Sequence, residues 1–142
     1  MLDVRSATPD DAEVIATLND EFNATATTAD DVRTRFEASN GHELVYIATE
    51  DEVAVGFACA QVYDSICYRR PMAEVTEIYV RDHYRNRGVG SALLARIESD
   101  LVARQVSEVR IETGLANEIA KTLYLSSGYS AVEHQVLVKK LE

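Results

Sequence analysis

The sequence contains no long apolar run and only two cysteines, Cys59 and Cys67, among its 142 residues. No apolar stretch approaches the roughly 20 residues that a membrane-spanning helix needs, so no membrane insertion is expected. The N-terminus lacks the charged and apolar regions of a signal peptide, and two cysteines outside a secretory context are typical of reduced thiols. These absences predict a cytoplasmic protein without disulfides, with Cys59 packed inside.

Histidine and positive charge are also scarce. The histidines, His42, His83 and His134, are scattered without metal-ligand spacing, so no metal site is expected. Asp and Glu outnumber Lys and Arg by 24 to 14, which gives a net charge of −10. This charge disfavours non-specific nucleic-acid binding and would attract cationic partners such as amines, although a need for solubility explains it equally well.

The length and composition, with 46% hydrophobic residues and no linker or repeat, predict a single domain over residues 1–142. Hydrophobic patterns predict strands at residues 2–7, 44–48, 53–60, 73–80, 108–113 and 132–138. They also predict helices after Pro9, at 29–38, from 89 to about 102, and after Asn117. The first of these has an apolar face of Val14, Ile15, Leu18 and Phe22. Because a strand–helix–strand unit crosses over between parallel strands, the expected fold is α/β with a mixed sheet.

A glycine-containing loop joins the strand at 73–80 to the helix that follows. The first N–H groups of a helix have no partner within it, and the helix dipole makes this end positive, so anions bind there. Gly88 and Gly90 would let an oxyanion approach the main chain, and Ser91 adds a hydroxyl. Arg85 and Arg87 add cationic groups suited to phosphate. A plain turn with solvated arginines is the alternative. Neither Gly-x-Gly-x-x-Gly nor Gly-Lys-Ser/Thr is present, which disfavours a dinucleotide fold and a P-loop.

The strand, the pattern Arg85-x-x-Gly88-x-Gly90 and the following helix resemble the acyl-CoA-binding signature of the GNAT superfamily of N-acetyltransferases. The segment from Asn117 to Tyr129 is similar to the family's second signature, an Asn, a small residue, a Tyr and a Gly–aromatic pair. Residues 4–12 are similar to the family's first strand and helix entry. This resemblance spans nearly the whole chain. It implies a central mixed sheet flanked by helices, whose parallel strands splay apart to admit acetyl-CoA.

The resemblance implies mostly main-chain contacts with acetyl-CoA, to the pantetheine arm from the end of the strand and to the pyrophosphate from the loop. The residues concerned are Ile78, Tyr79, Val80, Arg85, Asn86, Arg87, Gly88, Val89, Gly90, Ser91, Asn117 and Tyr124. Strand packing is the alternative for Ile78 and Val80, and helix capping for Asn117. Arginines at 69, 70, 81, 85 and 87 are expected to form a basic cluster suited to such an anionic ligand.

Acetyl transfer needs a neutral amine and a proton donor for the departing thiolate, because an ammonium has no lone pair with which to attack. Tyr124 matches the tyrosine that in the family lies near the cofactor sulfur and can protonate the thiolate. Packing within its helix is the alternative. Three strand carboxylates are candidates for the general base, and we rank Glu77 and Glu112 ahead of Glu74. Each has the alternative of a solvated or ion-paired carboxylate, and a water-relayed base would widen the choice.

The sequence thus predicts an N-acetyltransferase that moves the acetyl group of acetyl-CoA to a small-molecule or peptide amine in a ternary complex. Segments 22–40 and 62–72 should form much of the acceptor wall. The alternative is a non-catalytic acyl-CoA-binding sensor or scaffold, in which Tyr124 merely packs. Dimers are common in the family, so the resemblance allows a homodimer.

Overall fold

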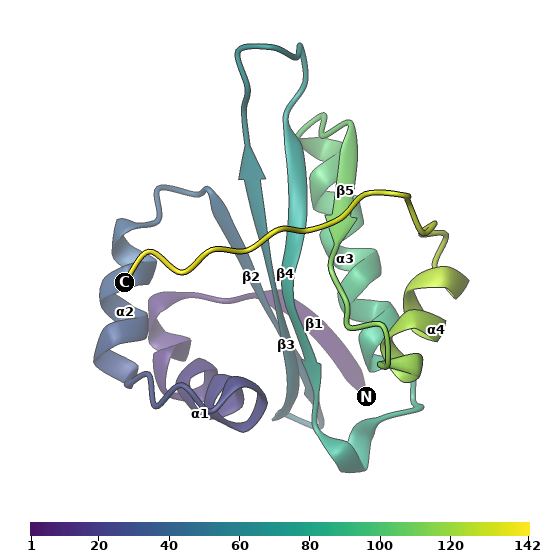
Figure 1. The fold of residues 1–142 in the computed structure, drawn as a ribbon. Coiled ribbons are helices and arrows are strands. Elements are labelled where there is room, and N and C mark those ends of the chain that lie inside the picture. Colours follow the sequence, from purple (N-terminus) through teal and green to yellow (C-terminus); the bar gives the residue numbers. More distant parts are fainter. The chain divides into compact units, whose positions relative to one another are not determined.

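The computed structural model describes residues 1–142 and divides them into two compact units, Met1–Glu112 and Thr113–Glu142. The first unit holds a five-stranded sheet in the order β1-β2-β3-β4-β5 (Figure 1). Its strands are β1 (Leu2–Ser6), β2 (Glu43–Glu50), β3 (Val53–Tyr63), β4 (Met72–Val80) and β5 (Glu108–Ile111). Neighbouring strands are antiparallel from β1 to β4, whereas β4 and β5 are parallel. The predicted mixed α/β fold is confirmed.

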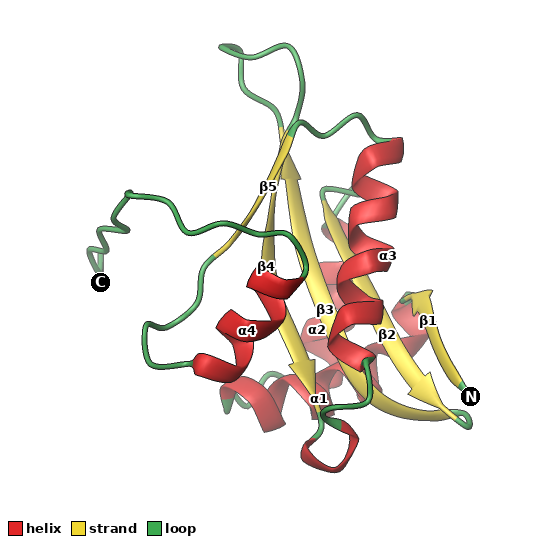
Figure 2. Ribbon diagram, turned by 90° about the vertical axis from the view of Figure 1, so that its right-hand side faces the viewer, coloured by secondary structure: helices red, strands yellow, loops and turns green.

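Helices cover both faces of this sheet (Figure 2). The helical elements of the first unit are η1 (Pro9–Asp11), α1 (Ala12–Asn23), α2 (Ala29–Ala38), η2 (Asp82–Tyr84) and α3 (Val89–Ala103). On one face, Leu18 of α1 packs against Phe57 and Cys59 of β3. On the other face, Gly56 of β3 lies toward Leu93 of α3. Successive strand residues point to opposite faces, so β3 lies between the two helices.

The helix patterns explain most of the core. In α3 the residues that recur every four positions, Val89, Leu93, Ile97 and Leu101, are at most 3% exposed, as predicted. In α1 the buried residues are Ala12, Ile15 and Leu18.

The apolar face predicted for α1 is buried only in part, because the Val14 and Phe22 side chains are 37% and 43% exposed. Phe22 instead stacks on Tyr79 at the margin of the core, with 5.2 Å between ring centroids. Cys59 is buried as predicted, and both cysteines are free thiols.

The turn between β2 and β3 also follows its sequence. Asp51 and Glu52 both have positive φ, 50° and 69°, as a two-residue type I′ turn requires. This turn sets the pairing of Glu50 with Val53 and hence the hairpin. β5 ends at Ile111, two residues before the predicted end of this strand.

The second unit contains α4 (Glu118–Ser126) and the segment that follows it to Glu142. The prediction of a strand at 132–138 is wrong, because these residues form no strand and pair with none. Val136, Leu137 and Val138 are 64–89% exposed. An apolar alternation favours a strand only where a neighbouring strand edge supplies hydrogen bonds. No helix of the chain is both long and apolar enough to cross a bilayer.

Candidate functional site

The glycine loop begins where β4 ends. After Val80 the chain forms the short η2 turn and then reaches Gly88, the N-cap of α3. Asn86 and Gly88 have φ of 62° and 84°, in the left-handed region that favours glycine and, among other residues, asparagine. An added Cβ at Gly88 would meet no atom within 4 Å, so the conformation of the main chain, rather than crowding, explains this glycine.

The N-terminus of α3 differs from those of α2 and α4. Thr28 caps α2 by accepting a hydrogen bond from the Asp31 N–H, and Asn117 caps α4 in the same way. At α3 no side chain caps the helix, and its first turn has no acidic residue. The first N–H groups of α3 therefore keep their capacity for an anion, and the helix dipole favours one.

The arginines beside this helix end are only loosely held. Arg85 donates from Nε to the Val80 carbonyl oxygen at 3.0 Å and pairs with the exposed Asp82 at 2.9 Å. Arg87 lies 3.7 Å from a carboxylate oxygen of Glu50 and stacks over the Tyr84 ring. Exposed ion pairs of this kind contribute little, so a phosphate could replace them.

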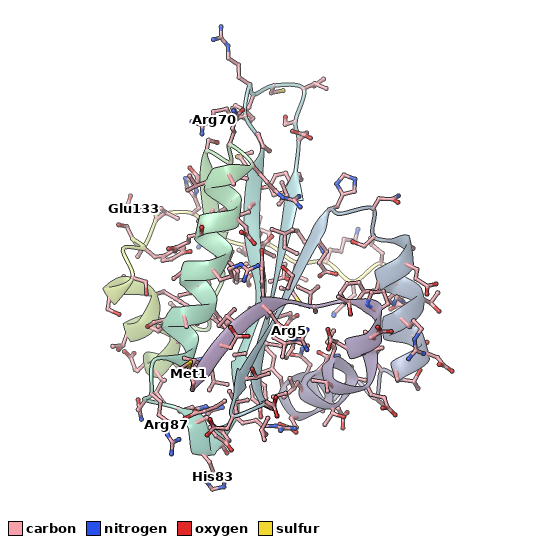
Figure 3. All side chains as sticks on the ribbon, turned by 180° about the vertical axis from the view of Figure 1, so that it is seen from behind. Met1, Arg5, Arg70, His83, Arg87 and Glu133 are labelled. Atoms are coloured by element: carbon pink, nitrogen blue, oxygen red, sulfur yellow. The ribbon has the colours of Figure 1, made fainter.

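The predicted cluster of five arginines is wrong. Arg81 is committed to Glu21, with Nη2 2.8 Å from Oε2. Arg70 donates to the Gln105 carbonyl oxygen at the opposite end of the sheet from Arg87, as Figure 3 shows. Arg69 adjoins Arg70 in the same β3–β4 connection. The arginines are close in sequence, but β4 is extended and separates its two ends, so only Arg85 and Arg87 flank the start of α3.

The edge of β4 next to the loop is open. β5 pairs with β4 only from Met72 to Val75, so residues 76–80 have no strand partner on that side. The Arg81 N–H donates to the Val55 carbonyl oxygen of β3 at 2.8 Å. Main-chain groups alternate between the two edges of a strand, so those of Ile78 and Val80 point away from β3. The Val80 carbonyl oxygen already accepts from Arg85 Nε at 3.0 Å, and the pantetheine contacts of Ile78 and Val80 stay a prediction.

The three candidate bases have different surroundings. In the pairing of β3 with β4, Glu74 lies opposite Gln61 and Glu77 lies opposite Cys59, and a bulge separates these two pairs. Gln61 and Cys59 are two residues apart on β3, so the bulge brings both glutamates to the face that α1 covers. Glu77 accepts a hydrogen bond from Asn23 of α1 at 3.1 Å. Glu112 follows the end of β5 and is exposed.

Glu43, at the start of β2, was missed from the sequence. Burial raises the pKa of Glu43; a hydrogen bond with Gln61 opposes this rise, and the charge of Glu77 adds to it. Glu43 therefore lies near Glu77 although 34 residues separate them in the chain. Burial raises the pKa of the Cys59 thiol well above its usual value, and both carboxylates add to this rise. No local pattern could reveal this group, because it depends on the pairing of β2 with β3.

In the second unit, Asn117 accepts a hydrogen bond from the Ala120 N–H at 3.2 Å and so caps α4. Tyr124 is 9% exposed, and its ring lies against the Tyr129 ring with 6.2 Å between the ring centroids. Burial raises the pKa of Tyr124, so its phenol keeps its proton at neutral pH. The protonated phenol is available as a proton donor. No group of three or more His, Cys, Asp or Glu residues has an arrangement that could hold a metal ion.

This fold and these motifs define a class of acyl-transferring enzymes. The model of the acetyltransferase (GNAT) family matches residues 12–129, so the chain belongs to this family and is an acyltransferase. A curated relative, aminoglycoside N(6')-acetyltransferase type 1 of Salmonella typhimurium, is 28% identical over 102 residues, which cover 70% of each chain.

Solved structures share the fold. AAC(6')-Iy in complex with the bisubstrate analog CoA-S-monomethyl-acetylneamine matches with a TM-score of 0.84 and 23% identity, covering 99% of this chain and 98% of that one. Ribosomal-protein-alanine N-acetyltransferase from Brucella melitensis matches with a TM-score of 0.85 and 17% identity over the full length of both chains. These two proteins, named for different acceptors, share one architecture with this chain.

Proposed function

We propose that this protein transfers the acetyl group of acetyl-CoA to a primary amine by direct attack in a ternary complex. The observation that carries the proposal is the uncapped N-terminus of α3, which follows the open edge of β4. In the proposed complex, the amides from Arg85 to Ser91 hold the pyrophosphate, and the main chain of Ile78 and Val80 pairs with the pantetheine amides.

The proposed reaction forms one bond and breaks one. The amine nitrogen attacks the thioester carbonyl carbon, the carbon–sulfur bond breaks, and CoA leaves as a thiolate. Glu77 takes the proton of the amine, and Tyr124 gives its proton to the thiolate. Of the three carboxylates, Glu77 is favoured because Asn23 already orients it. Glu112 stays the second candidate.

A cationic small-molecule amine is the proposed acceptor. Glu43, Glu74 and Glu77 lie close together on one face of the sheet. The whole chain carries a net charge of −10. Such a field attracts amines that carry several positive charges. The relatedness to an aminoglycoside acetyltransferase supports the same class of acceptor.

The test is a panel of amines, aminoglycosides first and peptide N-termini second, incubated with acetyl-CoA while release of free thiol is followed. We expect turnover with the aminoglycosides. The Tyr124→Phe variant should lose roughly 100-fold or more in kcat while its affinity for CoA persists. Turnover by Tyr124→Phe equal to that of the wild type would contradict the role of Tyr124. CoA binding without turnover on any amine would contradict the enzyme proposal.

The CoA site has its own test. Replacement of Arg85 by alanine should weaken CoA binding about tenfold in calorimetric titration, because a cationic group at the pyrophosphate is lost. Arg33→Ala is the matched control, since Arg33 pairs only with the exposed Asp30 on α2. Equal CoA affinity in the two variants would contradict the role of Arg85 in binding phosphate.

A further inference from the structure

Asn23, the last residue of α1, links this helix to the candidate base. Its side-chain nitrogen Nδ2 donates to Oε2 of Glu77 at 3.1 Å and to Oδ1 of Asn19 at 2.7 Å. A side-chain amide has two N–H hydrogens, so Asn23 uses both of them in these bonds. The bond to Glu77 joins residues that are 54 positions apart in the sequence.

The hydrogen bonds continue from Asn23 into the loop between α1 and α2. Asn19 donates from Nδ2 to the Thr25 hydroxyl at 3.0 Å, and the Thr25 and Thr27 hydroxyls lie 3.0 Å apart. Asn19 thus accepts through its oxygen and donates through its nitrogen. The side-chain amides of Asn19 and Asn23 each have one orientation that satisfies all of their hydrogen-bond partners. The series of hydrogen bonds from Thr27 to Glu77 is therefore internally consistent.

The loop that receives these bonds has an unusual backbone. Ala24 and Ala26 have φ of 52° and 55°, and alanine in this region costs roughly 1 kcal/mol or more. Asp20 accepts from the N–H groups of both residues, from Ala24 through its carbonyl at 2.9 Å and from Ala26 through its carboxylate at 3.2 Å. Such a conformation persists only where surrounding groups fix it, so this loop is built into one shape.

The helix α1 has anchors other than Asn23. The helix is anchored by the buried side chains of Ala12, Ile15 and Leu18. Near its end, Glu21 accepts from the Tyr79 hydroxyl and from Arg81, each at 3.0 Å. Asn23 itself is exposed. Its bonds therefore add little to the stability of the fold, but they fix the direction of one carboxylate.

We infer that Asn23 is a positioning residue for the acetyl transfer proposed above: it holds the Glu77 carboxylate in the orientation that receives the amine proton and ties it to the loop of residues 24–28. The inference rests on the proposed function. The bond from Asn23 engages Oε2 of Glu77, which leaves Oε1 the less engaged oxygen for the amine proton. Because the same chain of bonds reaches Thr25 and Thr27, an acceptor that displaces this loop also displaces the base.

The first measurement is the steady-state kinetics of Asn23→Ala with an amine that the wild type acetylates. We expect kcat to fall roughly 10- to 100-fold, because a misplaced base loses much of its effect. The KM for acetyl-CoA and the melting temperature should stay near their wild-type values. Asn23→Asp, which keeps the shape but replaces the donor by an acceptor facing Glu77, should not restore the rate. Thr17→Ala, an exposed substitution on the same helix, should behave as the wild type.

The second measurement separates a positioning role from any other. In a Glu77→Gln background, which already lacks the base, Asn23→Ala should cause little further loss, because Asn23 acts through Glu77. Equal losses in the wild-type and Glu77→Gln backgrounds would overturn the inference.

The remaining outcomes distinguish the two proposals. If Glu77→Gln abolishes turnover while Asn23→Ala leaves kcat unchanged, only the role of Asn23 is overturned. If Glu77→Gln turns over normally, both Glu77 as the base and Asn23 as its positioning residue are overturned, although acetyl transfer stands. If the wild type acetylates no amine, the proposed function fails first, and the inference fails with it.

Discussion

Gly56 lies within β3, where its Cα faces the main chain of β4. A Cβ added there would lie 2.6 Å from the Tyr79 carbonyl oxygen and 3.4 Å from the Val80 Cα. Backbone atoms of a paired strand cannot move aside as a flexible side chain can. The glycine therefore permits a close approach of β3 to the end of β4, the strand end that leads into the proposed CoA site.

We expect Gly56→Ala to lower the melting temperature by roughly 3 to 10 °C, as overpacking of about 1 to 3 kcal/mol would do in a chain of this length. Gly114→Ala is the matched control, because nothing lies within 4 Å of a Cβ added there. Thermal unfolding of both variants checks this prediction. A melting temperature for Gly56→Ala equal to that of Gly114→Ala would show that the strands can separate at no cost.

Glu43 provides a pH-dependent prediction at the same scale. Because its pKa is raised from 4.5 in the folded state, the folded protein holds this proton more tightly than the unfolded chain does. Ionisation of Glu43 therefore lowers the free energy of unfolding as the pH rises above 4.5. It has no effect well below pH 4.5.

Glu43→Gln removes that penalty, so the variant should melt roughly 2 °C above the wild type at pH 7.5. The difference should shrink toward zero as the pH falls below about 4, where Glu43 is protonated in both states. Melting curves recorded from pH 3.5 to 8 provide the test. A constant difference at every pH would mean that the carboxyl group acts through its shape rather than its charge.

At the scale of elements, the helix N-termini divide into capped and uncapped. In α2, Thr28 accepts from the Asp31 N–H at 3.1 Å and Asp31 accepts from the Thr28 N–H at 3.1 Å, which forms a capping box. α3 has no such residue before it, although it is the longer helix and buries more side chains. The burial of α3 stabilises it without a cap, so its first turn needs no side-chain partner.

Loss of the cap should be measurable in α2. Thr28→Ala should destabilise the protein by about 1 kcal/mol and lower its melting temperature by roughly 3 °C. Thr34→Ala, an exposed threonine within the same helix that makes no hydrogen bond through its side chain, serves as the control. If both variants melt together, the capping box contributes nothing measurable to α2.

Most element boundaries could be predicted from the sequence, since they follow local rules. The α2 prediction of 29–38 coincides with the observed helix, and the Asp51–Glu52 turn lies where the hairpin required it. The strand predicted at 132–138 failed because its existence depends on a partner edge rather than on its own residues. The basic cluster failed because closeness along a β-strand is not closeness in space: Arg70 and Arg87 lie at opposite ends of β4.

At the scale of the whole molecule, burial is distributed unevenly along the chain. All buried apolar side chains except Tyr124 belong to Met1–Glu112. The segment after Tyr129 has no regular structure, and its apolar residues are exposed. Local stability follows the density of buried contacts and protected hydrogen bonds. The central strands should therefore open last and the C-terminal segment first.

Hydrogen–deuterium exchange followed by mass spectrometry checks this order. Peptides from residues 130–142 should be fully exchanged at the earliest labelling time, those of α4 should exchange next, and those of β2 and β3 should exchange last. Protection of residues 132–138 would contradict the structure and would show that the predicted strand forms after all, against an edge of this chain or of a second copy.

The sequence by itself determined the family and the order of most elements, and it predicts an anion-binding loop before α3, because periodicity, turn residues and helix-end chemistry act over a few residues. Only the tertiary structure decided which carboxylates meet. The bulge opposite Cys59 places Glu74 and Glu77 on one face, whereas strict alternation would separate them, and strand pairing brings Glu43 near them. Asn23 reaches Glu77 only because the C-terminal end of α1 lies against β4. Such contacts depend on strand register and helix packing, which residues distant in the sequence determine together.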